Sequence, residues 1–269
     1  MAEKIAVLSQ KGGTGKTTAV RHLADAFRRA GLSVLAVDLD PQGNLSGYFD
    51  VPPDASPTIG EVLAGQAKAR EAVHDGVIPS SLHLASVESS LTGKIGRELT
   101  LRKALKPIDG DWDVILMDCP PNLGLLAVCG LVAADHALLS AQAQHFALEG
   151  VAQALEVVEL VRDGLNGDLS LLGIAFTIAD LRTVHSREAV ASLREERPGD
   201  VLDTVVRQSI AYAESAERAT SILDHRPDLG GDYVLLADEL LGRLGLAAAR
   251  RRLKPLVKDA QARAAASAA

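Results

Sequence analysis

The chain has 269 residues, of which 47% are hydrophobic and 3% aromatic, and its formal net charge is −7. This length and apolar content suffice for one large α/β domain whose core is built mainly from aliphatic side chains. The acidic balance excludes a protein whose whole surface attracts nucleic acid. Any DNA binding must therefore come from a local basic patch, or from patches summed in a dimer.

The cysteines and the lengths of the hydrophobic runs indicate the cellular compartment of the protein. Cys119 and Cys129 lack the spacing of a metal site and favour a reducing cytosol over a disulfide framework. The first strand begins by Ile5, which leaves no room for a signal peptide. The longest uncharged apolar stretch, residues 123–134, is shorter than the roughly 20 residues that cross a bilayer. We therefore expect a soluble cytoplasmic protein.

Strand-like and helical patterns alternate along most of the chain. This alternation predicts an α/β fold in which a mostly parallel, twisted sheet carries helices on both faces. The expected strands are residues 5–8, 33–39, 82–85, 112–117, 137–140, 171–178 and 201–206. The expected helices are residues 19–30, 59–64, 88–105, 147–163, 186–195 and 232–246.

Two segments break this pattern. Residues 50–57 contain three prolines and are expected to form a loop. Residues 1–247 are expected to form one domain, and residues 248–269 a basic, alanine-rich tail that is partly helical or disordered. Pro255 is expected to interrupt any long helix in this tail, and its last six residues to fray.

A glycine-rich turn lies between the first expected strand and the first expected helix. Such a turn points backbone N–H groups and the positive end of a helix at one spot, which suits phosphate. Lys16 would neutralise the β- and γ-phosphates, and the Thr17 hydroxyl would ligate Mg²⁺. The candidate nucleotide-binding residues in this turn are Lys11, Gly12, Gly13, Thr14, Gly15, Lys16, Thr17 and Thr18.

The turn departs from the ordinary P-loop pattern, because Gln10 stands where the first glycine belongs and Lys11 follows it. Lys11 and Lys16 lie at opposite ends of the loop, so both cannot easily serve the same phosphates from one side. The variant resembles the deviant Walker A motif of the ParA/MinD group of P-loop NTPases. That resemblance implies that Lys11 reaches across a homodimer interface to the partner's ATP, and it makes Lys11 and Lys16 catalytic candidates.

Three carboxylates lie at the ends of expected strands. Asp118 ends an apolar strand and fits the Walker B role of holding Mg²⁺, directly or through water. Asp38 and Asp40 are spaced so that both can point toward the same crevice, and residues 38–44 resemble the "DxDPQGN" segment of ParA-type proteins. By that match Asp40 would orient the attacking water as a catalytic residue. Asp38 would interact with the groups that bind Mg²⁺ and with the lysines, without binding the ion itself.

Three further segments carry the resemblance through the rest of the chain. Residues 118–126, 146–150 and 180–183 resemble the "DCPPSLGLL", "FALEG" and "DxRT" segments of Soj/ParA proteins. The matches span residues 4 to 245 and indicate the short class, without an N-terminal helix-turn-helix extension. Residues 206–216 depart from the family's "IPRNVRLxEAPS" segment and clearly retain only its glutamate. Arg207 and Gln208 are the candidates for contact with the nucleotide base in this altered stretch.

The resemblance implies a function, which we state as an expectation. It implies an ATPase with a weak intrinsic rate that segregates chromosomes or plasmids, forms an ATP-sandwich homodimer and binds DNA without sequence preference. A ParB-type protein would stimulate hydrolysis and reset the cycle, and the ATPase would associate with the nucleoid. The candidate DNA-binding residues are Arg182, Arg187, Arg194, Arg218, Arg243, Arg250, Arg251 and Arg252.

Three alternative functions remain open at this point. A MinD-like ATPase would use a C-terminal amphipathic helix to bind membrane, but this tail lacks large apolar anchors, so no membrane association is expected. An electron-transferring ATPase that resembles the nitrogenase iron protein would need cysteines from both subunits, and Cys129 lies in an apolar run typical of a core. A tyrosine kinase of the same superfamily would need a tyrosine-rich tail, and this tail contains no tyrosine.

Overall fold

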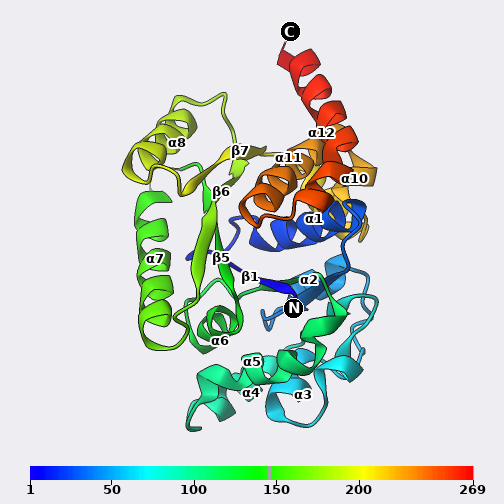
Figure 1. The fold of residues 1–269 in the computed structure, drawn as a ribbon, viewed down its shortest axis with the longest axis vertical. Coiled ribbons are helices and arrows are strands. Elements are labelled where there is room, and N and C mark those ends of the chain that lie inside the picture. Colours follow the sequence, from blue (N-terminus) through cyan, green and yellow to red (C-terminus); the bar gives the residue numbers. More distant parts are fainter. Residues whose placement is uncertain (145–146, 269) are drawn as a thin grey trace.

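Seven parallel strands form one sheet in the order β3-β2-β4-β1-β5-β6-β7, and helices cover both faces (Figure 1). The computed structural model describes residues 1–144 and 147–268. The strands are β1 (Glu3–Leu8), β2 (Val34–Asp38), β3 (Val77–Ile78), β4 (Val114–Asp118), β5 (His136–Gln142), β6 (Ser170–Ala179) and β7 (Val201–Arg207). The predicted single-domain α/β fold is confirmed.

The sheet separates two hydrophobic cores, because successive strand residues point to opposite faces. In β1, Ile5 and Val7 belong to one core while Ala6 and Leu8 belong to the other. The first core is covered by α1 (Lys16–Arg29), α2 (Asn44–Tyr48), α9 (Ala211–Glu217), α10 (Ile222–His225), α11 (Pro227–Arg243) and α12 (Ala247–Ala268). The second is covered by α3 (Ile59–Ala64), α4 (His83–Leu91), α5 (Thr100–Leu105), α6 (Leu125–Ala133), α7 (Ala147–Gly164) and α8 (Val184–Glu196). Short 3₁₀ turns occur at Ala69–Ala72, Arg97–Leu99 and Lys106–Asp111.

Strand register brings the carboxyl ends of the three central strands together. Asp118 at the end of β4 is paired in register with Val7 of β1 on one side and with Asp38 of β2 on the other. The loop that follows β1 therefore emerges beside both carboxylates. In open parallel sheets this edge is where ligands bind.

The strand expected at residues 82–85 is wrong, because Leu82 precedes α4 and residues 83–85 form its first turn. The apolar side chains of α4 recur at helical spacing, and Leu84, Val87 and Leu91 are all buried on one side of it. The actual strand in this region is β3, which has only two residues. The helix expected at residues 88–105 is also broken, since Gly96 adopts a φ of +70° between α4 and α5.

The C-terminal residues differ from expectation as well. Helix α12 continues through Pro255 to Ala268, so the interruption predicted at Pro255 is wrong. Leu253 is fully buried in the core that α12 shares with α1 and α11, and this packing supports the helix. Proline leaves the carbonyl of Arg251 without its helical partner, and both Pro255 and Arg251 are exposed residues. Within the described residues, no helix is long and apolar enough to span a membrane.

A buried polar cluster joins four helices, α1, α2, α9 and α11, on the α1 side of the sheet. All three tyrosines of the chain, Tyr48, Tyr212 and Tyr233, have their rings within 6.0 Å of the His22 ring, measured between centroids. His22 is fully buried, and its Nε2 lies 2.9 Å from the Tyr48 hydroxyl. Burial, and then the charge of Arg21, hold the pKa of His22 well below its ordinary value of 6.5.

This buried histidine predicts a loss of stability in mild acid. His22 stays neutral in the folded protein but takes up a proton in the unfolded chain below a pH of about 6.5. Its contribution is therefore retained above that pH and lost as the pH falls, by about 1.4 kcal/mol at pH 5.5. Urea unfolding at pH 7.5 and 5.5 should show a smaller pH-dependent loss in His22→Phe than in the native chain. Replacement of the exposed His185 by phenylalanine is the matched control, and an equal loss in all three proteins would contradict the prediction.

Candidate nucleotide-binding site

The glycine-rich loop between β1 and α1 lines a cavity of about 670 Å³ at the carboxyl edge of the sheet. All eight residues from Lys11 to Thr18 line it, together with Asp40 and the start of α2. Gly15 precedes α1 with a φ of +78°, and a Cβ there would lie 3.1 Å from the Ile178 side chain. This position therefore favours glycine on both backbone and steric grounds. The structure brings the sequence-predicted loop residues together around one cavity.

Lys16, Thr17 and Asp118 form a compact group at the floor of this cavity. The Lys16 amine donates to Asp118 Oδ1 at 2.9 Å, and the Thr17 hydroxyl donates to Asp118 Oδ2 at 2.7 Å. Asp118 is fully buried and Lys16 is 6% exposed. Burial opposes the charged amine, but the charge and hydrogen bond of Asp118 outweigh it and raise the pKa of Lys16. A hydroxyl beside a carboxylate is the oxygen donor set that Mg²⁺ prefers, so Thr17 and Asp118 fit this ion.

Asp38 is a buried anchor and Asp40 faces the cavity. Asp38 is fully buried, and its carboxylate accepts hydrogen bonds from the backbone and hydroxyl of Ser46 at 2.9 and 2.7 Å. Burial, followed by the charge of Asp118, raises the pKa of Asp38. Asp40 lines the cavity, and its Oδ1 accepts from the backbone of Gln42 at 3.0 Å. Asp38 thus holds α2 in place, while Asp40 is the carboxylate available to the bound nucleotide.

Side chains from β5 and β6 hold the loop from behind. Ser140 donates to the carbonyl of Thr14 at 3.0 Å, Thr177 donates to the same carbonyl, and Gln142 donates to the carbonyl of Gly13 at 2.6 Å. These bonds direct the carbonyls of Gly13 and Thr14 toward β5 and β6. The N–H groups of the loop are then left for a phosphate. Sequence motifs did not identify Ser140, Gln142 or Thr177. Their only signal is that each is polar and lies near the carboxyl end of an otherwise apolar strand.

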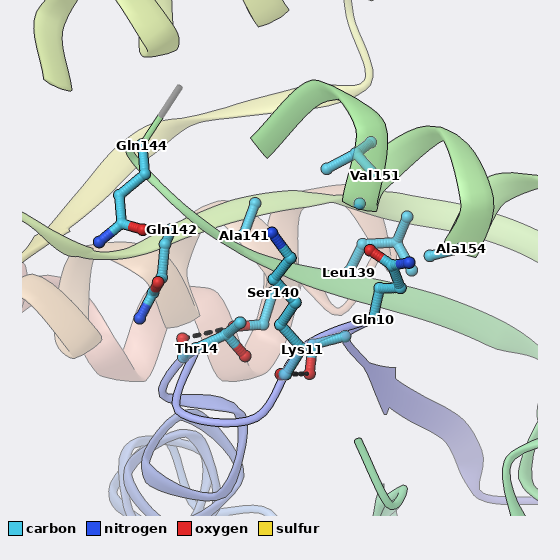
Figure 2. Close-up of a pocket in the computed structure, with 12 residues that line it drawn as sticks. Gln10, Lys11, Thr14, Leu139, Ser140, Ala141, Gln142, Gln144, Val151 and Ala154 are labelled. Atoms are coloured by element: carbon cyan, nitrogen blue, oxygen red, sulfur yellow. Dashed lines mark hydrogen bonds between the residues drawn. The ribbon is translucent and has the colours of Figure 1, made fainter. Parts of the chain in front are cut away.

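Lys11 lies between the nucleotide cavity and a small second pocket of about 40 Å³, and it lines both. Figure 2 shows its side chain extending from the loop along β5, beside Ser140 and Ala141. Its neighbour Gln10 donates its side-chain amide to Gln153 of α7. The structure therefore directs the two loop lysines differently, since Lys16 lies at the floor of the cavity against Asp118.

The two candidates for base contact do not line the cavity. The Arg207 guanidinium binds both carboxylate oxygens of Asp232, at 2.9 Å in the closest contact, and Gln208 donates its backbone N–H to the carbonyl of Ala179. Beyond the loop and residues 40–47, the cavity is lined by Tyr48 of α2, Pro121 and Ala216 of α9. The Phe146 position of the "FALEG" match lies outside the described residues.

The candidate DNA-binding arginines fall into two groups. Arg194, Arg243 and Arg252 donate to backbone carbonyls, and Arg250 binds Asp238 through two hydrogen bonds. These four contribute to the packing of the fold. The second group comprises Arg218, Arg251, Arg182, which binds Asp180, and Arg187, which donates to the carbonyls of Leu181 and Arg182. All eight candidates are exposed.

Comparisons with known proteins agree with this site. A family model described as an AAA domain matches residues 2–171. The chromosome-partitioning ATPase Soj of Thermus thermophilus is 37% identical over 90% of this chain and 96% of its own length. The chromosome partitioning protein ParA of Myxococcus xanthus is 34% identical over 93% of this chain and 91% of its own.

A similar protein of known structure has been crystallised with a nucleotide and magnesium. Cobyrinic acid a,c-diamide synthase from Mycobacterium smegmatis, crystallised with ADP and magnesium, is 37% identical with a TM-score of 0.73, over 84% of this chain and 95% of its own. It has also been crystallised with an ATP analogue and magnesium. ATP and Mg²⁺ are therefore the cofactors of the cavity described above, and the chain is an ATPase. It belongs to the Soj/ParA family of P-loop ATPases.

Proposed function

We propose that this chain is a DNA-segregation ATPase whose ATP-bound homodimer binds DNA without sequence preference. In this proposal a ParB-type protein stimulates hydrolysis and returns the dimer to single chains that leave the nucleoid. The observation that carries the proposal is the second lysine of the loop, Lys11, at the border of the nucleotide cavity. Family membership supports it, since the named relatives are chromosome-partitioning proteins.

The direction of the loop lysines supports the proposed dimer. Lys16 contacts Asp118 at the cavity floor, so it can neutralise the phosphates of its own nucleotide. Lys11 lies along β5 on the other side of the loop (Figure 2). A second chain docked across the mouth of the cavity would exchange Lys11 residues, each one near the partner's ATP. Each nucleotide would then stabilise the interface through charge-assisted contacts from both chains.

DNA binding requires several cations that can reach phosphates. We assign this role to the exposed arginines at the carboxyl edge of the sheet, which are Arg182, Arg187 and Arg218. Arg182 is 90% exposed and pairs only with the neighbouring Asp180 among the described residues. Because exposed pairs contribute little, exchange of Asp180 for a DNA phosphate is inexpensive. An ATP-held dimer presents two copies of this set and so couples the nucleotide state to DNA affinity.

Retention of DNA with different nucleotides tests this function. Fragments of unrelated sequence should be retained with a nonhydrolysable ATP analogue and released with ADP. Substitution of both Arg182 and Arg187 by alanine should lower the slope of log affinity against log salt by up to about 3.6, about 0.9 for each of four phosphate contacts in the dimer. Replacement of Arg250 by alanine is the matched control, since Arg250 also pairs with a carboxylate, that of Asp238, but its side chain is 46% exposed, against 90% for Arg182. Equal retention with ADP and the ATP analogue would contradict the proposal.

The ParB-type partner is tested separately by hydrolysis. A ParB-type protein bound to its centromere-like DNA should raise the steady-state ATPase rate and shorten the retention of the chain on DNA. The same protein added to a chain that cannot hydrolyse ATP should leave retention unchanged. Absence of any stimulation would leave the DNA-binding ATPase intact but would remove this partner from the proposal.

A MinD-like membrane function is the alternative, and α12 disfavours it. The apolar side chain of Leu253 in α12 is fully buried against the rest of the fold. The large hydrophobic residues that are exposed among the described residues all lie on other elements. A membrane helix needs an exposed apolar face. ATP-dependent flotation with anionic liposomes would favour the alternative.

Iron–sulfur and thiol chemistry are disfavoured by the two cysteines. Cys119 and Cys129 are both buried, which confirms the core position expected for Cys129. Burial raises the pKa of each thiol to about 12. Neither side chain is therefore suited to hold an iron–sulfur cluster between two subunits. The same burial disfavours glutamine-dependent amide synthesis, which needs a reactive thiolate to release ammonia from glutamine.

A further inference from the structure

Two short helices, α2 and α9, contribute to the lining of the nucleotide cavity and meet at Tyr48. Tyr48 is the last residue of α2, and it lines the cavity together with Gly47 of the same helix and Ala216 of α9. Its hydroxyl lies 2.9 Å from His22 Nε2 and 2.9 Å from the Ser215 hydroxyl. One buried oxygen therefore connects α1, α2 and α9 immediately behind the cavity.

Counting hydrogens gives the direction of these bonds. Ser215 donates its hydroxyl hydrogen to the carbonyl of Thr220, so in the contact between the two hydroxyls Tyr48 is the donor. The carbonyl of Tyr212, 3.3 Å from the Tyr48 hydroxyl, is a second and longer acceptor for the same hydrogen. The Tyr48 oxygen then accepts from His22, which assigns the proton of the neutral imidazole to Nε2. This assignment agrees with His22 Nδ1, which has no hydrogen-bond partner among the described residues. We call the chain of bonds from His22 through Tyr48 and Ser215 to the Thr220 carbonyl the tyrosine relay.

The middle and the last residue of α2 are thus both bonded to neighbouring parts of the nucleotide site. Ser46 binds the carboxylate of Asp38, two residues before Asp40, and Tyr48 binds α1 and α9 through the relay. The relay residues are almost completely inaccessible, since Tyr48 is 4% exposed and His22 and Ser215 are fully buried. In such an environment hydrogen bonds restrict motion strongly and an unpaired group is costly. The relay holds the two helices as one wall.

We propose that Tyr48 is a positioning residue for ATP, which acts by holding α9 against the part of the nucleotide beyond the phosphates. The loop provides the phosphate contacts, so Ala216 and Tyr48 enclose the remaining, nucleoside portion. The residues that the family resemblance offered for base contact, Arg207 and Gln208, do not line this cavity. In this chain the tyrosine relay holds α2 and α9 in position beside the nucleoside.

Removal of single hydroxyls tests the relay. Tyr48→Phe and Ser215→Ala should each raise the KM for ATP by about three- to tenfold and leave kcat within about twofold, because the lost contacts act equally on bound ATP and on the transition state. The double variant should be no worse than either single variant, since both remove the same chain of bonds. Ser215→Thr keeps the hydroxyl and should retain the native KM.

Two controls separate the relay from general damage to the fold. Tyr212→Phe removes a hydroxyl that is equally buried in the same cluster but has no hydrogen-bond partner among the described residues, so the KM should stay unchanged. Tripolyphosphate, which lacks the nucleoside, should bind Tyr48→Phe and the native chain with equal dissociation constants in calorimetry. An unchanged KM in Tyr48→Phe, an equal loss in Tyr212→Phe, or an equal loss of tripolyphosphate binding would each overturn the proposal.

Discussion

Replacement of Lys16 by alanine is expected to weaken MgATP binding by about 100-fold. The amine is the single cation at the cavity floor among the described residues, and its charge-assisted bonds to phosphate contribute about 1.5–3 kcal/mol each. Calorimetric titration of the variant and the native chain with MgATP and MgADP measures the loss directly. Because the β-phosphate is common to both nucleotides, affinity for ADP should fall as well.

The same substitution should destabilise the ligand-free protein. Asp118 is fully buried and would lose its ion-pair partner, and a buried carboxylate left unpaired costs about 3–5 kcal/mol. Lys4→Ala is the matched control, since Lys4 also pairs with carboxylates, Asp109 and Asp135, but at the opposite edge of the sheet. That variant should keep native nucleotide affinity. A Lys16→Ala protein that is fully folded by circular dichroism and binds MgATP normally would show that Lys16 is not the phosphate-binding lysine.

The parts of the fold that were predictable are those in which local pattern and tertiary position agree. Parallel central strands are buried on both faces, so they read as continuous apolar runs that end in a polar residue, as β2 and β4 do at Asp38 and Asp118. The strand expected at residues 82–85 failed because a short apolar run has no period of its own. The remainder of α4 shows the helical spacing that distinguishes the two.

The candidate site likewise contains residues that the sequence predicts and residues that it does not. The loop from Lys11 to Thr18 is contiguous, and its chemistry can be read from neighbouring residues. Ser140, Gln142 and Thr177 reach the loop only because β5 lies beside β1 and β6 beside β5 in the sheet. Strand order is a tertiary property, so single polar residues in those strands carry no recognisable pattern. Tyr48 was missed for a similar reason, since its partners lie 26 and 167 residues away.

Replacement of Asp40 is expected to have the opposite effect to loss of Lys16, because it should stop hydrolysis while ATP remains bound. Asp40 lines the cavity and is the carboxylate that we assign to orienting the attacking water. Phosphoryl transfer depends mainly on positioning and charge, so loss of the group that holds the water should lower kcat by about 100-fold or more. Asp40→Asn preserves an oxygen for the backbone of Gln42, whereas Asp40→Ala does not, so agreement between the two variants excludes a purely structural effect.

The trapped state then tests the shared nucleotide. With saturating MgATP, light scattering should give twice the mass of one chain for Asp40→Ala, and the same protein should remain on DNA. The further substitution Lys11→Ala should return this variant to single chains, because each dimer would lose two cations that contact the partner's nucleotide. It should leave ATP affinity of the single chain near native, since Lys16 and Asp118 are untouched. Single chains of Asp40→Ala in MgATP would contradict the dimer, and a dimer that persists without Lys11 would show that other contacts hold the two chains together.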